Sequence, residues 1–446
     1  MNKLRRFNVV SLILLFVTMA LVTRVQAQSA ATCAADAIVQ AGDTLSGIAA
    51  RYYGSLSAYQ QIITATNARA AVDSSYTTIG NANIVSVGWK LCLPGPLLTL
   101  PATTAPSGAA SMLAGPPTPV SPTPTRLPVV APTPPVLDPA DELHPLMIEA
   151  MRQQSYPGSP IVLEETLAPG VNYNRYLTSY QSEGNKIFAL LTVPQGQKPA
   201  TGWPVVIFNH GYIPPEIYRT TERYIAYVDA FARNGYIVFR SDYRGHGFSE
   251  GEALGGYGSP AYTVDILNAV ASVKQYADAD PNRIGMWGHS MGGQITLRAM
   301  VISDDIKAGV IWAGVVASYP DLLARWRRPL SETQPSAIPP AARRWRQELI
   351  KQYGTPEENP TFWAAVSPNS YIADLSGPIQ LHHGTADTSV PPWFSDVLNE
   401  QIQLVGGTVE LYTYPGDDHN LAANLGTALT RSVAFFDKYV KGVAVP

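Results

Sequence analysis

The residue of this sequence best suited to chemistry is a serine flanked by glycines. Ser290 lies in Gly-His-Ser-Met-Gly-Gly (288–293), between a strand-like run at 284–287 and a helical stretch at 294–301. Glycines two residues before and two residues after a serine allow the tight strand-to-helix turn that presents a nucleophilic hydroxyl. A serine in an ordinary glycine-rich loop is the alternative, but the strand and the helix in their required places favour a nucleophile elbow at Ser290.

A serine hydroxyl is a weak nucleophile and needs a histidine base, which an acid must orient. Asp387 comes directly after a strand-like run at 379–381, and His419 comes after the last such run at 409–412. Because parallel strands end at one edge of a sheet, Asp387 and His419 would meet Ser290 there. The sequence therefore predicts that Ser290, Asp387 and His419 are catalytic.

Other titratable residues lie close to this set in the sequence. Asp417 and Asp418 adjoin His419 directly, where a carboxylate has poor geometry for orienting the far ring nitrogen. We expect these two aspartates to cap the closing helix instead. His382 and His383 come just before the acid loop, and we expect both to be structural.

Acyl transfer also requires two hydrogen-bond donors for the oxyanion that develops on the substrate. The backbone N–H of Met291, at the start of the elbow helix, is one candidate. The other is the backbone N–H of Tyr212, in the loop that follows the strand-like run at 205–208. The Tyr212 hydroxyl could instead line the substrate pocket, and the sequence leaves both roles open.

The elements that must position these residues alternate between strand-like and helical over residues 138–446. This alternation predicts an α/β fold with a doubly wound, mainly parallel sheet and helices on both faces. Further strand-like runs lie at 236–239 and 309–312. Two earlier runs, at 161–165 and 186–193, are expected to be antiparallel edge strands.

Between Val316 and Pro378 the alternation gives way to a helical, proline-containing insertion, which we expect to cap the active site. It contains Trp326, Trp345 and six arginines, namely Arg325, Arg327, Arg328, Arg343, Arg344 and Arg346. The arginines could meet a substrate carboxylate. A solvated cap face with the tryptophans packed beneath it is the favoured interpretation.

Residues 160–443 resemble the catalytic domain of the prolyl oligopeptidase family within the α/β-hydrolases. The similar segments are Asn209–Tyr212, Ser241–Gly251, the serine elbow, Ser367-Pro368 with Pro378–Pro391, and Asp418-His419. The resemblance implies a triad of Ser290, Asp387 and His419 and a covalent acyl-enzyme, with no metal or cofactor. Such peptidases usually carry a large β-propeller, for which the 310 residues from Leu137 to Pro446 leave no room. Peptide substrates and acetyl or feruloyl esters therefore both remain open.

A second, smaller pattern covers residues 33–94, with a strand-like start, helical stretches at 45–49 and 59–66, and a final strand. The segments Val39–Leu45, Thr66-Asn67 and Val87–Pro94 resemble the corresponding parts of a LysM module. The resemblance implies a small βααβ domain that binds N-acetylglucosamine chains of peptidoglycan or chitin. One wall of its groove would contain Gly42, Asp43 and Thr44. A small α+β domain without a ligand is the alternative.

The two cysteines of the chain flank this smaller domain. Because the terminal strands of a βααβ fold pair with each other, Cys33 and Cys92 would become neighbours. An exported chain meets oxidising conditions, which favour a disulfide between them. Closing a loop of about 60 residues stabilises the fold by about 4 kcal/mol on the chain-entropy model. Two free buried thiols are the alternative.

The remaining segments concern export and spacing. Three basic residues ahead of an apolar run at 9–22, followed by Val25-Gln26-Ala27, are typical of a signal peptide at 1–27. We therefore expect a secreted, cell-wall-associated protein with no membrane span after cleavage, because the run is shorter than a bilayer requires. Residues 95–137 are rich in proline and threonine, which predicts an extended, semi-rigid linker.

Composition narrows the class of protein further. Charged residues make up 15% of the chain and the net charge is −3, so no positive field draws it to nucleic acid. Two cysteines and the lack of a His-Glu-x-x-His motif leave no visible metal-ligand set. The leading hypothesis is an exported serine hydrolase, acting on a peptide or ester substrate and tethered to an amino-sugar polymer. The alternatives are a carboxylesterase acting on polysaccharide and a binding protein whose hydrolase fold has lost activity.

Overall fold

The computed structural model describes residues 33–39, 45–53, 58–79, 88–97, 129, 131–138, 142–326 and 340–442. The chain divides into two compact units, residues 1–119 and 120–446. The predicted signal peptide, most of the predicted linker and the loop with Gly42, Asp43 and Thr44 lie outside the described residues. No helix within the described ranges combines the length and apolar composition that a membrane span needs.

The N-terminal unit is a small α+β fold. Its elements are β1 (Cys33–Ile38), α2 (Leu45–Tyr53), α3 (Tyr59–Ala70) and β2 (Lys90–Pro94), and the two strands pair antiparallel. Its core consists of apolar side chains from all four elements, among them Ile48, Ile62 and Leu91. The second helix extends to Ala70, beyond the predicted end at residue 66, because Ala68, Arg69 and Ala70 are strong helix formers.

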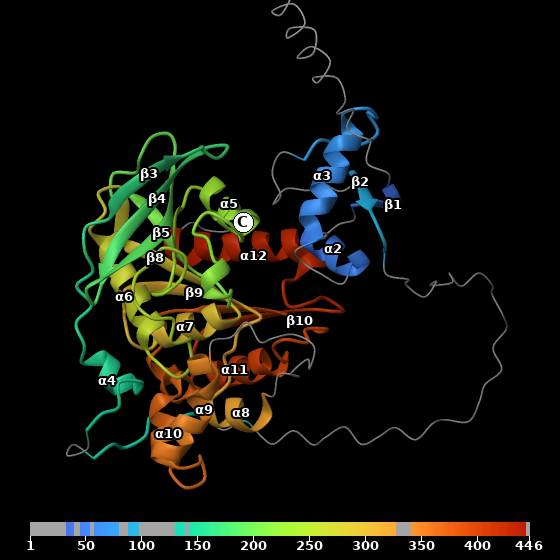
Figure 1. Ribbon diagram of the computed structural model, residues 1–446. Helices are drawn as coiled ribbons and strands as arrows, with labels where there is room; N and C mark the ends of the chain where they lie inside the picture. The colour runs from blue at the N-terminus through green and yellow to red at the C-terminus, as the bar shows by residue number, and fades with distance from the viewer. Residues whose placement is uncertain are drawn as a thin grey trace, which may run out of the picture. The chain divides into compact units, whose positions relative to one another are not determined.

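Within the described part of the second unit, nine strands form one sheet (Figure 1). In chain order they are β3 (Val162–Leu167), β4 (Tyr173–Ser182), β5 (Asn185–Pro194), β6 (Trp203–Asn209), β7 (Ile237–Ser241), β8 (Ala279–His289), β9 (Ile306–Trp312), β10 (Ile379–Gly384) and β11 (Val409–Tyr414). The spatial order is β11-β10-β9-β8-β6-β7-β5-β4-β3. Strands β6 to β11 pair in parallel and β3 to β5 pair antiparallel, as an α/β-hydrolase fold requires.

The runs predicted at 161–165 and 186–193 are both antiparallel strands, as expected, but only the first is an edge strand. The second is β5, which lies third from the edge between β4 and β7. Strand β4 pairs with β5 along its whole length, and its sequence, Tyr-Asn-Arg-Tyr-Leu-Thr-Ser-Tyr-Gln-Ser, has too few aliphatic residues to stand out as a strand. The sequence alone places the second run at the edge because it contains no clear sign of β4, which lies between β3 and β5.

Helices cover both faces of the sheet, because alternate strand residues face opposite sides. The helices are α4 (Ile148–Arg152), α5 (Ile225–Arg233), α6 (Ala261–Lys274), α7 (Met291–Met300), α11 (Trp393–Leu404) and α12 (Leu425–Phe436). In β6, Val205 and Ile207 pack into one cluster with residues of α6, α7 and α11, whereas Val206 and Phe208 pack into another with residues of α5 and α12. This two-sided burial explains the nearly continuous apolar runs of the central strands.

The insertion between β9 and β10 is helical, as predicted. It forms α8 (Tyr319–Arg325), α9 (Pro340–Tyr353), α10 (Pro360–Val366) and the 3₁₀ segment η3 (Pro368–Asp374). The helices α8, α9 and α10 lie together below α11 in the view of Figure 1. Trp326 and Trp345 are 7% and 5% exposed. The exposed Arg325 pairs with Asp321 at 3.4 Å and lies 3.8 Å from the ring centroid of Trp393. These positions match a solvated face over packed tryptophans; Arg327, Arg328 and the Arg343 side chain lie outside the described residues.

Candidate active site

Ser290 occupies a strained turn between β8 and α7. Its φ and ψ angles are 54° and −116°, a conformation that L-residues rarely adopt. A Cβ atom on Gly288 would lie 2.3 Å from the carbonyl oxygen of Gly292, and one on Gly292 would lie 2.0 Å from that of Asn209. The flanking glycines are therefore needed for close backbone approach, which is the geometry predicted for a nucleophile elbow.

The loop after β6 packs directly against this elbow. The Asn209 side chain donates a 2.9 Å hydrogen bond to Thr296 Oγ1 on α7, and a Cβ on Gly211 would lie 3.2 Å from the Cβ of Ser290. The next residue, Tyr212, is half-buried and its ring packs against the larger core cluster. The loop with Tyr212 and the helix start at Met291 thus approach Ser290 from two segments, as the oxyanion prediction requires.

Asp387 and His419 are brought together at the ends of the paired parallel strands β10 and β11. His419 Nδ1 lies 2.7 Å from Asp387 Oδ2. The other carboxylate oxygen, Oδ1, accepts hydrogen bonds from the backbone N–H groups of Ser389 at 2.7 Å and Val390 at 2.9 Å. The carboxylate is therefore fixed by its own loop, and its Oδ2 is directed toward the imidazole of His419.

A second histidine also faces this carboxylate. His383 Nε2 lies 3.2 Å from Asp387 Oδ2, and its Nδ1 lies 2.7 Å from Ser395 Oγ. Burial alone would raise the pKa of Asp387, but the hydrogen bonds with His383 and His419 hold that pKa well below its usual range. The expectation that His383 is purely structural is thus incomplete, because its ring helps keep the acid ionised.

The rival carboxylates take the capping role expected of them. Asp417 accepts hydrogen bonds from the N–H groups of Ala423 and Asn424, at 3.1 and 3.0 Å. Asp418 Oδ1 accepts from the N–H of Asn420 at 2.9 Å. They cap the 3₁₀ turn η4 (Ala422–Asn424), which leads into α12. Both carboxylates are therefore engaged by this turn and do not orient His419.

The other neighbouring histidine is structural, as expected. His382 is fully buried in β10, where its Nδ1 lies 2.7 Å from the Tyr414 hydroxyl and its Nε2 lies 2.7 Å from Gln380 Oε1. Burial lowers the pKa of His382 to about 3.

Across the described ranges, no three His, Cys, Asp or Glu side chains gather as metal ligands.

Two further residues beside the site escaped prediction. His289, the residue before Ser290, has its Nδ1 2.8 Å from the Tyr224 hydroxyl and its Nε2 2.9 Å from the carbonyl oxygen of His419. Burial lowers the pKa of His289 to about 3, so its ring is neutral at neutral pH. Tyr224 lies 65 residues earlier in the chain and carries no local signal of this contact.

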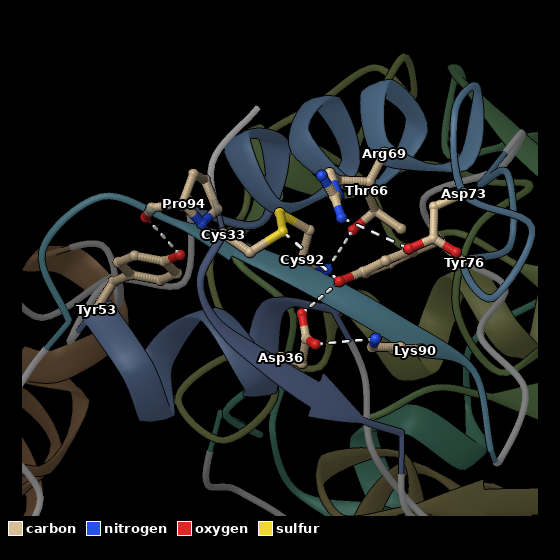
Figure 2. Close-up of a disulfide and its surroundings, with 10 residues drawn as sticks. All are labelled: Cys33, Asp36, Tyr53, Thr66, Arg69, Asp73, Tyr76, Lys90, Cys92 and Pro94. Carbon is tan, nitrogen blue, oxygen red and sulfur yellow. Dashed lines mark hydrogen bonds and ion pairs between the residues drawn. A yellow bond between two sulfur atoms is a disulfide. The ribbon is translucent and has the colours of Figure 1, made fainter. Parts of the chain in front are cut away.

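In the N-terminal unit, the predicted disulfide between Cys33 and Cys92 is confirmed, with a Cα–Cα distance of 5.2 Å (Figure 2). Thr66 Oγ1 accepts the N–H of Cys92 at 3.0 Å. The Asn67 side chain bonds both backbone groups of Ile79, at 2.6 and 3.0 Å. The Thr66-Asn67 motif therefore connects α3 to β2 and to the segment at Ile79.

Beside the disulfide lies a cluster of charged and aromatic side chains (Figure 2). The Tyr76 hydroxyl donates to Asp36 Oδ1 at 2.6 Å, and Lys90 Nζ lies 3.0 Å from Asp36 Oδ2. Lys90 Nζ is also 4.4 Å from the ring centroid of Tyr76. The hydrogen bond with Tyr76, together with Lys90, lowers the pKa of Asp36.

Residues 223–443 match the sequence model of the prolyl oligopeptidase family. The uncharacterized peptidase YuxL of Bacillus subtilis is 26% identical over 245 residues, which are 54% of this chain and 34% of that protein. The probable dipeptidyl-aminopeptidase B of Penicillium rubens is 25% identical over 276 residues, which are 60% of this chain and 28% of that protein. This chain thus spans about a third of the length of these relatives.

Among solved structures, the acetyl xylan esterase from Paenibacillus sp. R4 shares the fold, with a TM-score of 0.50 and 16% identity. The match covers 66% of this chain and 92% of that one. The nine-stranded sheet, the glycine-flanked Ser290 and the family match agree with one another. Residues 223–443 of this chain are therefore similar to the prolyl oligopeptidase family, and its second unit has the sheet of an α/β-hydrolase-like fold.

Proposed function

We propose that the protein hydrolyses its substrate through a covalent acyl-enzyme, with Ser290 as nucleophile, His419 as base and Asp387 as the orienting acid. The observation that carries the proposal is the Asp387 carboxylate. One of its oxygens faces His419 Nδ1 at 2.7 Å and the other is fixed by two backbone N–H groups. An ionised acid at Nδ1 keeps the proton of His419 there and leaves Nε2 free to accept one from a serine.

The reaction then proceeds by addition and elimination. His419 Nε2 takes the hydroxyl proton as the Ser290 oxygen bonds to the substrate carbonyl carbon, and the N–H groups of Met291 and Tyr212 receive the resulting oxyanion. Collapse of this intermediate breaks the bond to the leaving group, which takes the proton from His419. Water repeats the two steps and releases the acid. Throughout, the ionised Asp387 stabilises the imidazolium of His419.

For the substrate, we propose short esters first and short or unstructured peptides second. Both classes use the same residues, but an amide leaving group must be protonated by His419 and the peptide must be seated firmly. The named relatives support a peptidase, and the shared fold of an acetyl xylan esterase leaves acetyl esters of polysaccharide as the alternative. A side-by-side assay of p-nitrophenyl acetate, aminoacyl anilides and N-blocked peptides separates these classes.

The central test uses a fluorophosphonate probe, which reacts only with an activated serine. We expect the folded protein to be labelled, and labelling and p-nitrophenyl acetate turnover to disappear together in Ser290→Ala. Ser318→Ala is a matched control, because Ser318 caps α8 rather than taking part in the proposed reaction. If folded wild type is not labelled, the alternative of a binding protein without activity is correct.

We also propose that the chain is exported and that the N-terminal unit is a LysM module tethering it to peptidoglycan or chitin. The strand–helix–helix–strand order, the disulfide and the motif resemblance support this. Deletion of residues 28–94 should abolish retention on the insoluble polymers and leave ester turnover largely intact. Equal retention of the truncated protein would contradict the proposal.

A further inference from the structure

A chain of hydrogen bonds joins the three segments of the proposed catalytic site. The backbone N–H of Gly211, in the loop with Tyr212, donates to the Tyr224 hydroxyl at 3.0 Å. That hydroxyl lies 2.8 Å from His289 Nδ1, beside the serine elbow. His289 Nε2 lies 2.9 Å from the carbonyl oxygen of His419. One tyrosine and one histidine therefore link the oxyanion loop, the nucleophile and the base.

The donor and the acceptor of each of these hydrogen bonds follow from where the protons must lie. A carbonyl oxygen only accepts, so His289 must carry its proton on Nε2 to bond the backbone of His419. Nδ1 of the same ring is then an acceptor, and the Tyr224 hydroxyl donates to it. The hydroxyl oxygen remains free to accept the N–H of Gly211. Every group is satisfied in this single arrangement, and burial keeps His289 neutral by lowering its pKa to about 3.

The backbone around Tyr224 is held in an unusual conformation that places the hydroxyl. Arg223 and Tyr224 both have left-handed φ angles, 57° and 50°, immediately before α5. Such residues persist only where the surroundings enforce them. Here the buried Arg240 donates hydrogen bonds to the carbonyl oxygens of Thr220 and Arg223, and Phe208 packs against the Tyr224 ring with 5.4 Å between centroids.

We propose that Tyr224 is a positioning residue for hydrolysis. Through His289 it fixes the backbone of His419, and through Gly211 it fixes the loop that supplies the oxyanion donor. It touches neither substrate nor the reacting atoms. The inference rests on the proposed roles of Ser290 and His419, because it assigns Tyr224 the task of keeping them correctly spaced.

Tyr224→Phe removes the hydroxyl and keeps the ring, and therefore tests this role. We expect kcat for p-nitrophenyl acetate and the rate of fluorophosphonate labelling to fall together by about 10- to 100-fold, because small displacements of reacting groups have effects of this size. KM should change little, since no substrate contact is lost. Wild-type rates in folded Tyr224→Phe would overturn the inference.

Tyr227→Phe is the matched control. Tyr227 lies three residues later, within α5, and its hydroxyl donates at 3.1 Å to the carbonyl oxygen of Asn420, next to His419. Both variants lose one hydroxyl bonded near the base, so similar decreases in Tm are expected. Only Tyr224→Phe should lose rate. An equal loss of rate in both variants would show a merely structural role and contradict the inference.

If Tyr224→Phe fails to fold, two variants of His289 test the same chain of hydrogen bonds. His289→Gln retains a side-chain N–H for the carbonyl of His419, and His289→Leu does not, so the glutamine variant should be labelled several-fold faster. If Tyr224→Phe does fold, the losses in the double variant Tyr224→Phe/His289→Leu should not add, because both changes break the same chain of hydrogen bonds. Equal labelling of the two His289 variants would overturn the inference. Loss of wild-type labelling itself would instead refute the proposed function.

Discussion

The two units of this chain are stabilised in different ways. The N-terminal unit has one small apolar core and a disulfide that joins its first and last strands. The second unit, residues 120–446, is named the hydrolase domain after its α/β-hydrolase-like fold. It contains no cysteine and instead buries both faces of a nine-stranded sheet in two apolar clusters. A small domain buries too little surface to dispense with a cross-link, whereas the large sheet does not need one. A change that destabilises one unit should therefore leave the stability of the other unit unaffected.

Their charged groups differ as well. Asp36, in the N-terminal unit, forms an ion pair with Lys90 whose side chains are 39% and 30% exposed. Asp387, in the hydrolase domain, has a side chain with no exposed surface and is bonded from several sides. Exposed ion pairs contribute about 0–1 kcal/mol, whereas a buried charge depends strongly on its partners. This difference predicts where a carboxylate can be lost without consequence and where it cannot.

The largest expected effect is on turnover. Asp387→Asn replaces the acceptor at His419 Nδ1 with an uncharged amide, which neither fixes the tautomer nor stabilises the imidazolium. We expect kcat for p-nitrophenyl acetate to fall about 10³- to 10⁴-fold. The control is Asp36→Asn, which should turn over at the wild-type rate. More than a tenth of wild-type activity in folded Asp387→Asn would exclude Asp387 as the orienting acid.

The next largest effect is on stability. Reduction of the Cys33–Cys92 disulfide should destabilise the N-terminal unit by about 4 kcal/mol, because the cross-link closes a loop with a sequence separation of 59 residues. Calorimetry of the full chain should show one unfolding transition move to lower temperature with reductant while ester turnover stays constant. Cys33→Ala/Cys92→Ala should be insensitive to reductant. A reductant-induced shift of the hydrolase transition would contradict the separation of the two units.

The sequence predicted those site residues that have local signals. Ser290 is flanked by glycines that the packing requires, and Asp387 and His419 each follow an apolar run that becomes a parallel strand. Parallel order then places the ends of these strands at one edge of the sheet. These positions could be predicted because strand, turn and reactive residue are adjacent in the chain, and the catalytic roles stay a prediction.

Other features have no local signal. Strand β4 is polar enough to be overlooked, and its position becomes evident only from its pairing with β5. His289 contacts a carbonyl 130 residues further along the chain, and Tyr224 reaches it across 65 residues. Such contacts depend on the packing of the whole domain, so residue type and spacing could not have revealed them.

The last expected effect concerns how stability depends on pH, where the two units should respond in opposite directions. The folded pKa of Asp36 is lowered, first by the hydrogen bond from Tyr76, so its contribution is present above the unfolded value of about 3.8 and is lost as the pH falls below it. Burial raises the pKa of Asp242 to about 7. Its contribution is present below about 3.8 and is lost as the pH rises toward 7.

Replacing either aspartate with asparagine removes its titratable carboxyl. The difference in unfolding free energy between wild type and variant then changes with pH only through that carboxyl, since any other effect of the amide is the same at every pH. Relative to Asp36→Asn, the N-terminal unit of wild type should lose stability between about pH 5 and pH 3. Relative to Asp242→Asn, the hydrolase domain of wild type should lose stability between about pH 4 and pH 7, because Asp242 must then ionise in a fully buried site despite the hydroxyls of Thr220 and Ser249 that donate to it. The measurement is calorimetry of both transitions across this range. Parallel curves for wild type and variant would show that the carboxylate has the same pKa folded and unfolded, and would remove the contrast between an exposed and a buried acid.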